Sequence, residues 1–164
     1  AIGAPDTLAG YVLEGADVVT TCTADKAAAT VLADADVAPG MHINAIGGDC
    51  PGKTELDALT LERGPVFVEH TPQTRIEGEI QNVAADFPVT EFWEVLTERA
   101  PGGTSAEQIT IFDSVGFAIE DFSALRYLRA SVAGTPWEKS IDLVAAPEDP
   151  KDLFGMAHAP VPVA

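Results

Sequence analysis

The stretch HINAIGGDCPGKTEL, residues 42–56, decides the fold, because it predicts a strand end, a tight glycine turn and a helix start in succession. Apolar residues at positions 41, 43, 45 and 46 suit a buried strand, and TELDAL, residues 54–59, suits the opening of a helix. The turn carries a carboxylate, a thiol and an amine at Asp49, Cys50 and Lys53. Open α/β sheets bind ligands at such turns, at the carboxyl ends of strands.

The rest of the chain alternates strand and helix patterns around this stretch. Short apolar runs predict strands over residues 16–22, 66–69 and 108–112, with a weaker extended segment at 30–32. Helical spacing predicts helices over 6–15, 55–63, 73–83, 89–96 and 115–132. The last helix is apolar enough early on to predict burial, and Trp93 is expected to anchor packing. This alternation predicts a mostly parallel α/β sheet flanked by helices.

Composition narrows the classes of function. The chain has 164 residues, 9 basic and 26 acidic, for a net charge of −17. Such an acidic surface argues against a nucleic-acid backbone as partner. No apolar run is long enough to cross a bilayer, so we expect no membrane partner and a soluble, cytoplasmic protein. Cys22 and Cys50 form no disulfide framework, are expected to be small buried residues, and suggest no metal site.

One reading of the central turn is a phosphate-binding loop. Gly47, Gly52, Lys53 and Thr54 have the spacing of that motif, and residues 109–113 could be the partner strand, ending in Asp113 as the aspartate that holds magnesium. The physics opposes this nucleotidase hypothesis. Pro51 has no N–H to offer an anion, and Asp49 would place a carboxylate inside the polyphosphate cradle. We therefore interpret the match to the phosphate-binding motif as accidental.

Without phosphates, the same turn has other interpretations. Gly47 and Gly48 would let the backbone bend sharply and a flat ligand approach closely. Asp49 is either an acid/base group or a turn residue bonded to its own backbone. Lys53 either steadies a ligand phosphate or carboxylate, or is solvated on the first turn of a helix. Spacing alone leaves these alternatives open.

Four stretches together resemble the ornithine cyclodeaminase/mu-crystallin family. They are the central run, ADVVTTCTADK (16–26), PQTRIEGEI (72–80) and IFDSVGFAIEDFSALRYL (111–128). The central run is similar to the cyclodeaminase branch. The resemblance implies a Rossmann-like, NAD-dependent enzyme that converts L-ornithine to L-proline and ammonia. In that chemistry a hydride leaves the α-carbon, the side-chain amine closes the ring, ammonia departs and the hydride returns.

The resemblance also implies roles for individual residues. Asp49 matches the catalytic acid/base and a contact to the substrate amine, and Val115 matches a substrate contact. The implied cofactor contacts are Thr23, Ile46, Gly47, Gly48, Lys53 and Ser114. Ser114 also makes sense as the start of a helix, whose free N–H groups attract ligands, with Asp113 helping to cap that helix. Arg75, Glu77 and Glu79 are interpreted as surface or interdomain ion pairs.

Features that the family implies are absent from this sequence. It has no Gly-x-Gly-x-x-Gly dinucleotide turn and no substrate-gripping N-terminal lobe. We therefore expect residues 1–115 to be a partial NAD-binding domain that lacks its N-terminal part. Residues 116–164 are expected to be a helical segment that packs back onto the missing substrate and dimerisation lobe. The full-length enzyme is expected to be a homodimer, and this chain alone inactive. Lysine cyclodeaminase, imine reductase and an inactive remnant stay open as alternatives.

Overall fold

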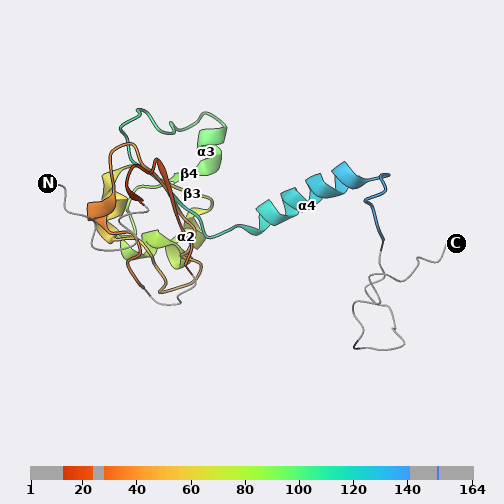
Figure 1. The fold of residues 1–164 in the computed structure, drawn as a ribbon, viewed down its shortest axis with the longest axis horizontal. Coiled ribbons are helices and arrows are strands. Elements are labelled where there is room, and N and C mark those ends of the chain that lie inside the picture. The colour runs from red at the N-terminus through yellow and green to blue at the C-terminus, as the bar shows by residue number, and fades with distance from the viewer. Residues whose placement is uncertain (1–12, 24–27, 141–150, 152–164) are drawn as a thin grey trace. The chain divides into compact units, whose positions relative to one another are not determined.

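The computed structural model describes residues 13–23, 28–140 and 151. It contains a five-stranded sheet in the order β1-β2-β5-β3-β4, in which neighbouring strands are all parallel (Figure 1). The strands are β1 (Val18–Thr21), β2 (His42–Ala45), β3 (Val66–Val68), β4 (Thr90–Glu91) and β5 (Thr110–Asp113). The predicted mostly parallel α/β sheet is confirmed.

The helices are short until the last one. Among the described residues they comprise three 3-10 helices, η1 (Asp34–Asp36), η2 (Ala58–Arg63) and η3 (Glu79–Asn82), and the α-helices α2 (Thr71–Glu77), α3 (Phe92–Leu96) and α4 (Ala118–Val132). The helix expected over 6–15 falls mainly outside the described residues. Gly78 divides the helix expected over 73–83 into α2 and η3, and β4 takes up the start of the one expected over 89–96.

The core lies on one side of the strands that form the middle of the sheet. Alternate residues Ile43 and Ala45 of β2 and Ile111 of β5 are buried, as the period of two in a strand requires. Leu61 of η2 and Ile80 of η3 belong to the same apolar cluster. These contacts hold β2 and β5 as the rigid centre from which the turns at their carboxyl ends project.

Internal contacts divide the chain after Phe117, into a unit of residues 1–117 and a second of residues 118–164. Described by itself, α4 has no buried residue, and it exposes the large apolar side chains Ile119, Phe122, Leu125 and Leu128. The prediction of a buried helix is therefore wrong for this chain. Within the described residues, no helix combines the length and apolarity needed to cross a membrane.

Two smaller expectations are also wrong. Cys22 is exposed and Cys50 half-buried, so neither is a small core residue. The Trp93 ring is exposed rather than packed in the core. Its Nε1 donates to Glu91 Oε2 at 2.6 Å, and the Arg99 guanidinium lies 5.2 Å from its centroid. Trp93 therefore stabilises the surface turn around α3.

Candidate functional site

The sheet register brings four strand ends to one edge. Thr21, Ala45, Asp113 and Val68 are neighbours across β1, β2, β5 and β3. The residues that follow them therefore emerge side by side at the carboxyl edge, where parallel α/β sheets bind ligands. The Ser114 amide donates to the Ala45 carbonyl at 2.9 Å, which links the turn after β5 to the turn after β2.

Lys53 joins two of the predicted site residues. Its ammonium donates to the backbone carbonyl of Thr23 at 2.9 Å and to Asp49 Oδ1 at 3.3 Å. The Lys53 side chain is only 5% exposed, whereas that of Asp49 is 57% exposed. The buried Lys53 ammonium therefore binds the accessible Asp49 carboxylate at the carboxyl edge of the sheet. The interpretation of Lys53 as a solvated helical residue is wrong.

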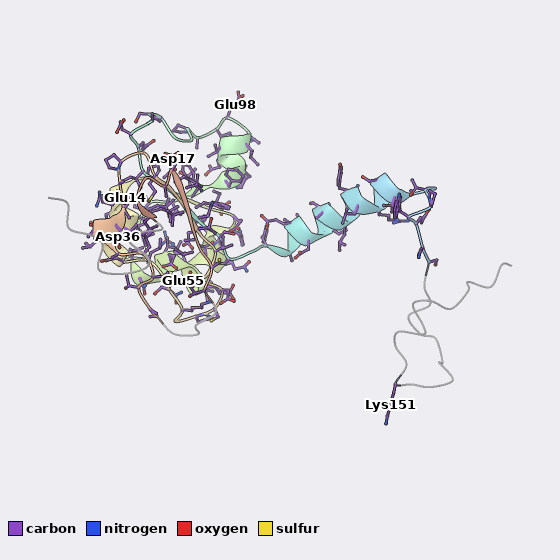
Figure 2. The ribbon with its side chains drawn as sticks, in the orientation of Figure 1. Glu14, Asp17, Asp36, Glu55, Glu98 and Lys151 are labelled. Carbon is purple, nitrogen blue, oxygen red and sulfur yellow. The ribbon has the colours of Figure 1, made fainter. Side chains whose placement is uncertain are left out.

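Glu55, labelled in Figure 2, is the buried carboxylate beneath this turn. It is 1% exposed, and its Oε1 accepts from the Thr23 amide at 2.8 Å and from the Thr23 hydroxyl at 2.5 Å. Its Oε2 is buried and has no hydrogen-bond partner among the described residues. Glu55 ties the end of β1 to the segment after the central turn, and no sequence pattern singled it out.

The two glycines serve close packing rather than a special backbone conformation. Neither Gly47 nor Gly48 has a positive φ. A Cβ on Gly47 would overlap the Glu55 carboxylate, and one on Gly48 would lie 3.3 Å from Glu79 Oε1. Protein carboxylates therefore occupy the Cβ side of both glycines, and the expectation that a flat ligand approaches their backbone stays a prediction.

A second carboxylate holds the turn after β5. Glu69 Oε1 accepts from the Ser114 hydroxyl, and Glu69 Oε2 accepts from the Val115 amide at 3.2 Å. These two residues precede α4, which begins at Ala118, so Ser114 is not its first residue. The structure thus brings Ser114 and Val115 together through Glu69, at the end of the neighbouring strand β3.

Asp113 and Glu79 form a buried scaffold behind the edge. The two oxygens of Asp113 accept from the amides of Glu79 and Ile80, both at 2.9 Å. Those of Glu79 accept from the amides of Glu55 and Leu56 at 2.8 and 3.0 Å. Asp113 therefore caps η3 rather than the last helix, and Glu79 is not a surface ion pair.

Burial changes the ionisation of this scaffold. Desolvation raises the pKa of Asp113 to about 7, against the two backbone hydrogen bonds that favour its charged form. Desolvation likewise raises the pKa of Glu79, against the hydrogen bonds from the amides of Leu56 and Glu55.

Arg75 and Glu77, the other two residues of the predicted ion pairs, also form hydrogen bonds with residues close to them in the sequence. Arg75 donates to the carbonyl of Phe87 at 2.6 Å, and Glu77 accepts from Gln73 at 3.1 Å.

The geometry also opposes a phosphate cradle. Residues 53–55 are irregular and η2 begins only at Ala58, so no helix N-terminus follows the turn. The Gly52 amide donates to Gln81 Oε1 at 2.6 Å, and the Lys53 ammonium is bound within the protein. The groups that would hold a polyphosphate are thus committed to other partners. Among the described residues, no group of three His, Cys, Asp or Glu side chains is arranged to hold a metal ion.

The fold and this edge define a parallel α/β domain that brings the exposed Asp49 carboxylate and the hydroxyls of Thr23 and Ser114 to the carboxyl ends of its strands. The profile of the ornithine cyclodeaminase/mu-crystallin family matches residues 8–135, and the chain belongs to that family. An ornithine cyclodeaminase of Agrobacterium fabrum is 59% identical over 150 residues, which are 92% of this chain and 42% of that protein. The resemblance seen in the sequence is confirmed.

Solved structures agree with the fold. A lysine cyclodeaminase, studied for its recognition of L-lysine, L-ornithine and L-2,4-diaminobutyric acid, has a TM-score of 0.73 and 31% identity. The match covers 89% of this chain and 43% of that one. An archaeal alanine dehydrogenase dimer with bound NAD has a TM-score of 0.65 and 34% identity, covering 71% and 38%. The chain thus spans about two fifths of the length of these relatives.

Proposed function

We propose that this chain is the C-terminal portion of an NAD-dependent ornithine cyclodeaminase, which converts L-ornithine to L-proline and ammonia. The observation that carries the proposal is the 59% identity over 92% of the chain to a protein of that name. The accessible Asp49 carboxylate supports it, because ornithine is a cationic amino acid and a carboxylate attracts its ammonium groups.

The groups at the carboxyl edge fit the cofactor. Thr23 is exposed and Ser114 half-buried, so their hydroxyls can reach a bound dinucleotide, as can the exposed Ile46 that precedes the buried Gly47 and Gly48. Bound NAD would supply a hydride acceptor for the substrate α-carbon and return the hydride after ring closure. Asp49 would bind the substrate amine and accept its proton, while Lys53 orients the carboxylate through their 3.3 Å contact.

The remaining parts of the proposal concern the whole enzyme. Residues 116–164 would pack on a substrate and dimerisation lobe, which would cover the exposed apolar side chains of α4. The whole enzyme would be a cytoplasmic homodimer. This chain by itself would neither bind NAD tightly nor form proline, because groups that bind the pyrophosphate and the substrate would lie outside it.

Lysine is the second candidate substrate. The likeness to a lysine cyclodeaminase favours it, but at 31% identity against 59% for the ornithine enzyme. Side-by-side turnover of the two amino acids by the whole enzyme decides between them. Ornithine is expected to have the higher kcat/KM, and a higher value for lysine would replace ornithine in the proposal.

The test of the proposed site is Asp49→Asn in the whole enzyme. Loss of the base is expected to lower proline formation by about 10²–10⁴-fold while the dissociation constant of NAD stays near that of wild type. Asp36→Asn is the matched control, because Asp36 is an exposed carboxylate on η1. Equal turnover in the two variants would refute the role of Asp49.

A further inference from the structure

Two carboxylates that the family resemblance leaves without a role each hold a hydroxyl at the carboxyl edge. From these contacts we infer that Glu55 and Glu69 are positioning residues that fix the Thr23 and Ser114 hydroxyls as hydrogen-bond acceptors. The edge then takes the hydrogen-bond donors of the nicotinamide riboside half of NAD rather than its pyrophosphate. This inference rests on the proposed function and deepens it.

Glu55 determines the direction of the Thr23 hydroxyl. A hydroxyl has one proton and two lone pairs, whereas a carboxylate oxygen that already accepts an N–H is an acceptor toward a hydroxyl as well. The Thr23 oxygen lies 2.5 Å from Glu55 Oε1, so the single proton of Thr23 points at Glu55. The same Oε1 accepts from the Thr23 amide at 2.8 Å, which fixes the backbone as well. The hydroxyl therefore offers only lone pairs to a ligand.

Glu69 acts in the same way on Ser114, with one difference. Each of its two oxygens accepts a different hydrogen bond: Oε1 accepts from the Ser114 hydroxyl and Oε2 accepts from the Val115 amide. Val68 of β3 and Asp113 of β5 are register partners, so the sheet itself holds Glu69 beside Ser114. The Ser114 hydroxyl also has its proton committed, and presents lone pairs only.

The rigid placement of Glu55 comes from packing. Its carboxylate is buried where a Gly47 side chain would be, and its backbone amide donates to Glu79 Oε1 at 2.8 Å. Glu55 cannot turn away from Thr23 without leaving that pocket. The hydrogen-bond direction of Thr23 is thus set by the fold before any ligand arrives.

Acceptor hydroxyls discriminate between the two halves of a dinucleotide. Phosphate oxygens only accept hydrogen bonds, so neither hydroxyl can donate to the pyrophosphate. The carboxylates of Asp49 and Glu69 lie at the same edge, with Lys53 bound to Asp49, and negative charge disfavours phosphate further. The nicotinamide carboxamide and its ribose carry N–H and O–H donors that match the acceptors.

The experiment compares NAD with ADP in the whole enzyme, because ADP has the pyrophosphate but lacks the nicotinamide and its ribose. Thr23→Val, Ser114→Ala, Glu55→Ala and Glu69→Ala are each expected to raise the dissociation constant of NAD about tenfold, the usual effect of one lost hydrogen bond. The dissociation constant of ADP is expected to change less than twofold. A merely structural defect would weaken both ligands.

The glutamine variants sharpen this test and guard against misfolding. Glu55→Gln keeps one accepting oxygen, which is all that Thr23 uses, so NAD affinity is expected within threefold of wild type. Glu69→Gln loses one of two accepting oxygens and is expected to weaken NAD about tenfold. Equal weakening of NAD and ADP, or unchanged NAD affinity in the alanine variants, would overturn the inference. A wild-type enzyme that forms no proline would instead refute the proposed function.

Discussion

At the scale of single residues, Asp113 carries the clearest consequence for pH. It is 0% exposed, both of its oxygens accept backbone N–H groups, and its pKa is raised to about 7. Between its ordinary value of 3.8 and about 7, the folded chain holds a proton at Asp113 that the unfolded chain has lost. The contribution of Asp113 to stability is therefore present at low pH and is lost as pH rises through 7.

Asp113→Asn tests the direction of this pH dependence, because asparagine resembles the protonated acid. Relative to the variant, the wild-type chain is expected to lose up to about 1.4 kcal/mol of unfolding free energy per pH unit between pH 4 and 7. Urea unfolding of both chains at several pH values measures the difference. Asp36→Asn, at an exposed carboxylate, is the control. A difference that stays flat or grows with pH would contradict the account.

At the scale of elements, Glu79 joins the start of η3 to the segment before η2. Its two oxygens accept from the amides of Glu55 and Leu56, so glutamine can satisfy only one of them. Glu79→Gln is expected to lower the unfolding free energy by about 1–3 kcal/mol and to speed hydrogen exchange at these two amides.

Glu77→Gln supplies the comparison for Glu79, since Glu77 is half-buried and accepts from a side chain, Gln73. Its effect is expected to stay within about 0.5 kcal/mol. Denaturant titration and amide exchange of the two variants give the result. Equal effects at positions 77 and 79 would mean that Glu79 does not hold the segment.

The sheet was predictable from local sequence, and the segment after the central turn was not. Alternating apolar residues in β2 and β5 mark strands wherever they occur. The helical pattern over 55–63 fails at its start because tertiary hydrogen bonds replace helical ones. Val31 and Leu32 both donate to the Glu55 carbonyl, and Leu32 pairs with Leu56 as an isolated bridge. Only from Ala58 onward does the chain coil, with Asp57 capping Leu59.

The candidate site was predictable only in part, for a related reason. Family motifs point to the residues that are proposed to face a ligand, such as Asp49 and Ser114. The carboxylates behind them act on partners distant in sequence, since Glu55 bonds Thr23 across 32 positions and Glu69 bonds Ser114 across 45. No local spacing encodes such contacts. Gly47 illustrates the same limit, because its neighbour Glu55 becomes visible only in the fold.

At the scale of the whole molecule, the acidic charge and the exposed helix have different meanings. Figure 2 labels Glu14, Asp17, Asp36 and Glu98 on the first unit, and all four are exposed. Exposed carboxylates and a net charge far from zero favour solubility. The exposed apolar side chains of α4 are a different case, because such a set is costly in water and is expected to meet another surface.

Leu125→Ser is expected to change the unfolding free energy of the whole enzyme more than that of this chain. Leu125 is 64% exposed here, so the unfolding free energy of this chain is expected to change by less than about 0.5 kcal/mol. In the whole enzyme the same change is expected to cost about 2–5 kcal/mol, because the side chain would be buried against the proposed lobe. Ser131→Ala, at another exposed position of α4, is the control. A small effect in both proteins would contradict the packing proposed for α4.

The central claim, that the Asp49 edge is part of an ornithine cyclodeaminase site, is tested most directly with L-ornithine deuterated at its α-carbon. The hydride that leaves this carbon is proposed to return to it after ring closure. The whole enzyme with NAD is therefore predicted to release ammonia and L-proline in equal amounts, with the deuterium retained, as mass spectrometry would measure. Proline that has lost the deuterium to solvent, or no proline at all, would contradict the account.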